Sequence, residues 1–168
     1  MSRNDRIRIE RTAGALGAEV TGVDLSKPLD AETVATLRAA WLEHLVLFYP
    51  GQKLSDPDLE RFTSYFGPFG KEPFVDGIST DHPNVLAVIK EADERRKANF
   101  GGNWHSDWSF QEAPPAGTFL YALEVPPYGG DTMWTNQYLA YETLTPGIER
   151  RLDGLEAIHS AKRPYGRE

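Results

Sequence analysis

The apolar residues of this chain gather in short runs that end at glycine or proline. Residues 45–49 read Leu-Val-Leu-Phe-Tyr and stop at Pro50-Gly51, and the strand-like residues 118–125 stop at Pro126-Pro127. A short apolar run bounded by turn residues is typical of a buried β-strand. Five further strands are predicted, at residues 6–9, 18–20, 85–89, 131–135 and 155–160. The pattern therefore favours a strand-rich fold, with residues 1–168 as a single domain.

A few helices are predicted around these strands. Asp30 is a suitable N-cap, and the apolar residues after it recur at helical spacing. Ser55 and Asp58 resemble a capping box at the start of a second helix. Two short helices are expected at residues 136–143 and 146–152. The expected class is mainly β with flanking helices (α+β), which suits a sandwich or a jelly roll better than a doubly wound parallel sheet.

Composition excludes several functions. Eighteen basic and 25 acidic residues give a net charge of −7, which argues against nucleic acid as a partner. The chain has no cysteine, so disulfides, thiolate ligands and a cysteine nucleophile are excluded. No apolar run is long enough for a membrane span, and the first ten residues do not resemble a signal peptide. We expect a cytoplasmic protein with no membrane partner.

The strongest candidate for chemistry is the stretch Asn-Trp-His-Ser-Asp-Trp at residues 103–108. On an extended segment the side chains of His105 and Asp107 point to the same side. Imidazole and carboxylate groups are suitable ligands for Fe(II), Mn(II) or Zn(II), although a divalent ion needs a third ligand. From these residues alone, a metal site, a proton-transfer pair and an ordinary surface turn all remain open.

The context of this stretch resembles one family. Residues 103–107 are followed by Pro-Pro-Ala-Gly at 114–117 and by Gly-Gly-Asp-Thr-Met-Trp at 129–134. In this order and spacing the chain resembles the TauD/TfdA (taurine dioxygenase-like) family of Fe(II)- and 2-oxoglutarate-dependent dioxygenases. The early residues 17–25 and 47–49 are similar to the N-terminal region of that family.

The resemblance implies a fold, a reaction and site residues. The family fold is a double-stranded β-helix, or jelly roll. By position, His105 and Asp107 are two of three iron ligands, and Thr132 helps to bind 2-oxoglutarate. The implied partners are 2-oxoglutarate, O2 and a small organic acid-type substrate, which is hydroxylated while succinate and CO2 are released. No catalytic side chain is expected beyond the metal ligands, and a homo-oligomer is possible.

Departures from the family concern the substrate. Glu72 and Val75 stand where members that act on taurine have a sulfonate-binding histidine and a tyrosine, and Gly101 replaces an asparagine. Trp108 replaces a small aliphatic residue, and Tyr165 aligns with a pocket aromatic residue. A carboxylate at position 72 that faced the pocket would repel a sulfonate. We therefore expect a substrate other than taurine, such as a larger or aromatic carboxylate or an alkyl sulfate.

The family's third ligand, a distal histidine, and its 2-oxoglutarate-binding arginine have no match before Glu168. His159 is the least implausible substitute ligand, although the resemblance places it elsewhere. One expectation is the N-terminal portion of a dioxygenase, with the jelly roll incomplete at its C-terminus and no activity alone. The alternative is a degenerate, non-catalytic binding or interaction protein. A Zn(II) hydrolase ranks last, because no motif positions a nucleophile or general base.

Overall fold

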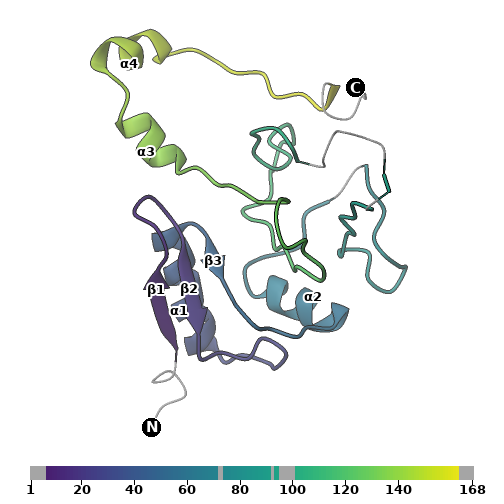
Figure 1. The fold of residues 1–168 in the computed structure, drawn as a ribbon. Helices are drawn as coiled ribbons and strands as arrows, with labels where there is room; N and C mark the ends of the chain where they lie inside the picture. Colours follow the sequence, from purple (N-terminus) through teal and green to yellow (C-terminus); the bar gives the residue numbers. More distant parts are fainter. Residues whose placement is uncertain (1–6, 72–73, 92, 95–100, 163–168) are drawn as a thin grey trace. The chain divides into compact units, whose positions relative to one another are not determined.

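The computed structural model describes residues 7–71, 74–91, 93–94 and 101–162. It divides into two compact units, residues 1–58 with 121–156 and residues 59–120 with 157–168. Figure 1 shows the helices and strands of the described residues. Among these helices, none has the length and apolar character that crossing a bilayer requires.

The first unit contains a three-stranded sheet in the order β1-β2-β3. Strand β1 (Arg8–Arg11) pairs antiparallel with β2 (Ala18–Thr21), and β2 pairs parallel with β3 (Leu47–Phe48). The turn between β1 and β2 needs glycine at position 17, where φ is +98° and a Cβ would lie 2.7 Å from Thr12 Oγ1. The predicted strands at 6–9, 18–20 and 45–49 are thus confirmed, with shifted bounds.

Helix α1 (Ala31–His44) covers one face of this sheet (Figure 1). It begins at the predicted cap, because Asp30 Oδ1 accepts a hydrogen bond from the Thr33 backbone N–H at 2.8 Å. The side chains of Leu37 on α1 and Val20 on β2 are fully buried. Alternating burial along β2 therefore places its apolar side chains in the core that α1 closes.

Helix α2 (Asp56–Ser64) begins with the predicted capping box. Ser55 Oγ donates to Asp58 Oδ2 at 2.6 Å, and the Asp58 backbone N–H donates to Ser55 Oγ at 3.4 Å. Within the second unit, the buried ring of Phe62 packs edge-on against Phe119 with ring centroids 4.9 Å apart. Phe66 contacts the same ring at 5.4 Å. This aromatic cluster anchors residue 119 to the helix.

Two short helices in the first unit match their predicted positions. Helix α3 (Gln137–Glu142) is capped by Asn136, whose Oδ1 accepts from the Leu139 backbone N–H at 3.0 Å. The Asn136 side-chain amide also donates to the Ala15 carbonyl at 2.8 Å, which ties the start of α3 to the β1–β2 turn. Helix α4 (Pro146–Leu152) follows with proline in its first turn.

Several strand predictions are wrong for the described structure. Residues 85–89, 118–125, 131–135 and 155–160 form no strand, and residues 107–110 form a turn. A strand requires hydrogen bonds to a neighbouring strand, and the described residues offer these segments none. Several of their apolar side chains are exposed, by 85% at Leu123 and 95% at Ile158.

The described architecture is therefore α+β, with a small mixed sheet, and is not mainly β. No second sheet occurs in the described ranges, so the jelly roll stays a prediction.

Replacing Phe62 with alanine should destabilise the second unit by about 3–5 kcal/mol, because a buried ring is lost and a cavity remains. Phe62→Leu, which keeps most of the apolar volume, should cost clearly less. Urea unfolding followed by tryptophan fluorescence measures both. Equal costs for the two variants would contradict the packing of Phe119 on Phe62.

Candidate metal site

His105 and Asp107 lie close together in the second unit, as the sequence predicts. The distance from His105 Nε2 to Asp107 Oδ1 is 3.1 Å, and their side chains are 51% and 37% exposed. The predicted extended strand is not what brings them together, because residues 104–106 are irregular and Asp107 begins a turn. The pair is open to solvent and accessible to an ion.

A backbone carbonyl fixes the protonation pattern of His105. Its Nδ1 lies 2.7 Å from the carbonyl oxygen of Asn103. A carbonyl can only accept, so Nδ1 carries a hydrogen and donates it. In the neutral imidazole, Nε2 then presents a lone pair toward Asp107.

The geometry suits two ligands of one divalent ion. A lone pair on Nε2 and a carboxylate oxygen repel each other at 3.1 Å unless a proton or a metal ion lies between them. Bonds of about 2.1 Å place neighbouring ligand atoms about 3.0 Å apart in an octahedral site and about 3.4 Å apart in a tetrahedral one. The observed separation falls in this range, so the donor set fits two positions of an iron site.

A further residue at this site was not predicted. Thr118 Oγ1 lies 2.6 Å from Asp107 Oδ2, the carboxylate oxygen that does not face His105. The sequence signal for it was weak, because Thr118 follows the motif by 11 residues and resembles an ordinary strand residue.

The structure places two of the predicted substrate residues next to His105 and Asp107. Gly101 has φ +68°, and a Cβ at this position would lie 3.3 Å from His105 Cε1. Trp108 directly follows Asp107 and has φ +43°, a left-handed conformation that is uncommon outside glycine. Its indole Nε1 is buried and makes no hydrogen bond within the described residues. Whether either residue contacts a substrate stays a prediction.

The other predicted site residues are not brought to the pair by any described contact. Thr132 is exposed and belongs to the first unit, so its role toward 2-oxoglutarate stays a prediction. Glu72 and Tyr165 lie outside the described residues.

The described residues do not complete a metal triad. No group of three or more metal-binding side chains occurs among them. His44 is buried at the end of α1, and His159 Nδ1 lies 2.7 Å from Ser109 Oγ. His82 Nδ1 lies 2.8 Å from Glu60 Oε2, and this hydrogen bond lowers the pKa of Glu60. The expected third ligand therefore has no counterpart in this part of the chain.

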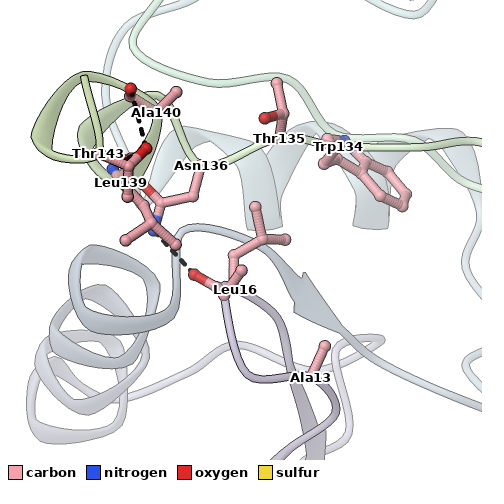
Figure 2. Close-up of a pocket in the computed structure, with 9 residues that line it drawn as sticks. Ala13, Leu16, Trp134, Thr135, Asn136, Leu139, Ala140 and Thr143 are labelled. Atoms are coloured by element: carbon pink, nitrogen blue, oxygen red, sulfur yellow. Dashed lines mark hydrogen bonds between the residues drawn. The ribbon is translucent and has the colours of Figure 1, made fainter. Parts of the chain in front are cut away.

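The first unit contains a cavity. It has a volume of about 430 Å³ and is lined by the β1–β2 turn, Trp134 and α3 (Figure 2). None of the predicted site residues lines it. Leu16, Leu139 and Trp134 give it an apolar character, and no charged side chain is present.

Comparison with known proteins identifies the family. The profile described as the taurine catabolism dioxygenase TauD, TfdA family matches residues 8–168. The chain belongs to the TauD/TfdA family.

Relatives within the TauD/TfdA family are similar over almost the whole chain. It is 37% identical over 163 residues to an alkylsulfatase of Acinetobacter baylyi, covering 96% of this chain and 49% of that protein. It is 35% identical to an alpha-ketoglutarate-dependent sulfate ester dioxygenase of Pseudomonas putida, covering 94% of this chain and 50% of that one. The chain thus spans about half the length of these curated relatives.

A solved structure supports the same assignment. The crystal structure of a taurine dioxygenase from Burkholderia xenovorans superposes with a TM-score of 0.68 at 34% identity. The match covers 89% of this chain and 51% of that one. The described fold is therefore that of the corresponding part of a TauD-like structure.

Replacing Gly101 with alanine should disturb His105. The left-handed backbone costs a residue with a Cβ about 1–2 kcal/mol, and the new Cβ would press on the imidazole at 3.3 Å from Cε1. We expect a lower free energy of unfolding and a shifted His105 Cε1–H signal in NMR spectra. Gly147→Ala is the control, because a Cβ there meets nothing within 4 Å. An unchanged His105 signal in Gly101→Ala would contradict the contact.

Proposed function

We propose that this chain forms part of an Fe(II)- and 2-oxoglutarate-dependent dioxygenase that oxidises a C–H bond of a small organic substrate. The observation that carries the proposal is the approach of His105 Nε2 to Asp107 Oδ1 at 3.1 Å, within a chain of the TauD/TfdA family. When bound, ferrous iron with 2-oxoglutarate and O2 supplies oxidative decarboxylation to succinate and CO2 together with oxidation of the substrate.

The residues of the chain supply geometry and charge. The Asn103 carbonyl accepts a hydrogen bond from Nδ1–H of His105, which leaves the lone pair on Nε2 to bind a metal ion. The Asp107 carboxylate offsets part of the charge of a divalent ion. Both side chains are partly exposed, so an ion held by them would also be accessible to 2-oxoglutarate and O2. Thr132 is our candidate for a hydrogen bond to the far carboxylate of 2-oxoglutarate.

For the substrate we propose an alkyl sulfate ester. Two relatives at 37% and 35% identity are named for chemistry on alkyl sulfates or sulfate esters. The sequence has Val75 and Gly101 where taurine-specific members have a tyrosine and an asparagine, and the loss of these polar contacts argues against taurine itself. Trp108 adds apolar surface beside Asp107, which suits an alkyl chain better than a short, fully polar molecule.

The test combines binding and turnover. The complete protein of which this chain forms part is purified and mixed anaerobically with Fe(II) and 2-oxoglutarate, and the absorption band of their complex is recorded. After admission of O2, succinate is measured with hexyl sulfate or taurine present. Hexyl sulfate should stimulate succinate release, whereas taurine should not. Asp107→Ala should reduce it by at least about 100-fold, because even residues behind a metal ligand contribute 10–100-fold. Ser106→Ala, an exposed neighbour, is the control.

Two results would contradict the proposal. Greater stimulation by taurine than by hexyl sulfate would overturn the substrate class. A folded protein that binds neither Fe(II) nor 2-oxoglutarate would overturn the dioxygenase function and favour the non-catalytic alternative.

A further inference from the structure

The two oxygens of the Asp107 carboxylate have different partners. Oδ1 lies 3.1 Å from His105 Nε2, and Oδ2 lies 2.6 Å from Thr118 Oγ1. A carboxylate only accepts, so the Thr118 hydroxyl donates this hydrogen bond. A distance of 2.6 Å is typical of a charge-assisted O–H···O⁻ bond, which is stronger than a bond between neutral groups.

Thr118 precedes a residue that is held in place by packing. The next residue, Phe119, packs against Phe62 at 4.9 Å and Phe66 at 5.4 Å between ring centroids. The β-branched side chain of threonine adds stiffness at χ1. The hydroxyl is therefore presented to Asp107 from an anchored segment and not from a freely rotating chain.

We propose that Thr118 is the positioning residue of the metal site, a role that rests on the proposed function. By donating to Oδ2, it sets the rotation of the carboxylate and leaves Oδ1 as the single oxygen aimed at the ion beside His105 Nε2. Without the hydroxyl, the carboxylate rotates and both oxygens compete for the ion or for the imidazole. The Asn103 carbonyl orients the His105 ring in the same way, by accepting a hydrogen bond from Nδ1. Each of the two ligands therefore has one hydrogen-bond partner on the side away from the ion.

Mn²⁺ alone serves as the probe, because EPR distinguishes free from bound Mn²⁺ without any turnover. Thr118→Val keeps the shape of the side chain and removes the hydroxyl. We expect Mn²⁺ affinity to fall by about 10–100-fold and the EPR spectrum of the bound ion to change, since its carboxylate ligand is reoriented. Thr118→Ser restores a hydroxyl and should restore most of the affinity and the spectrum. Thr80→Val, at an exposed threonine of the same unit, is the control and should bind like the wild type.

The outcomes separate this inference from the proposed function. Wild-type affinity and spectrum in Thr118→Val, with binding lost in Asp107→Ala, would overturn the role of Thr118 alone. Failure of Thr118→Ser to recover, with thermal stability unchanged, would also overturn it. Absence of Mn²⁺ binding by the wild type, or binding that survives Asp107→Ala, would overturn the proposed function and this inference together.

Discussion

The approach of an imidazole nitrogen to a carboxylate oxygen governs the chemistry that this chain can support. Because Nδ1 of His105 donates to the Asn103 carbonyl, Nε2 is the nitrogen that faces Asp107 Oδ1, at a distance of 3.1 Å. In the neutral ring these two atoms need a proton or a metal ion between them, and a metal ion of ordinary bond lengths fits the separation. The proposed metal-dependent reaction and the proposed roles of Asn103 and Thr118 both depend on this short approach of Nε2 to Oδ1.

The local scaffold explains why the pair holds its shape although it is exposed. The aromatic cluster of Phe62, Phe66 and Phe119 fixes the segment that carries Thr118, and Thr118 in turn binds Asp107. Burial of apolar rings thus provides rigidity to a polar site that has little burial of its own. This arrangement lies within the second unit, so it depends on contacts between α2 and the residues that follow the motif.

The sequence predicted those features that depend on residues close together in the chain. Asp30 and the capping box of Ser55 with Asp58 act through hydrogen bonds to residues three positions away, so the two helices they begin could be located. The closeness of His105 and Asp107 was also predicted from the sequence, because they are two residues apart and the surrounding motifs resemble the family, whereas their role as metal ligands stays a proposal.

Other features depend on residues that are distant along the chain. The predicted strands at 118–125 and 155–160 fail because pairing partners, and not local propensity, decide whether a strand forms. The contact of Thr118 with Asp107 could not be predicted for the same reason. It spans 11 residues and follows a turn that no local pattern defines. The identity of the family could therefore be predicted, whereas the outer contacts of its site could not.

A crystal structure of the protein with Mn²⁺, located by anomalous scattering, tests the central claim most directly. We predict one Mn²⁺ ion about 2.0–2.3 Å from both His105 Nε2 and Asp107 Oδ1, with Asn103 and Thr118 still hydrogen-bonded to the far sides of these two ligands. A protein that binds Mn²⁺ elsewhere, while His105 and Asp107 remain joined only by a hydrogen bond, would contradict it.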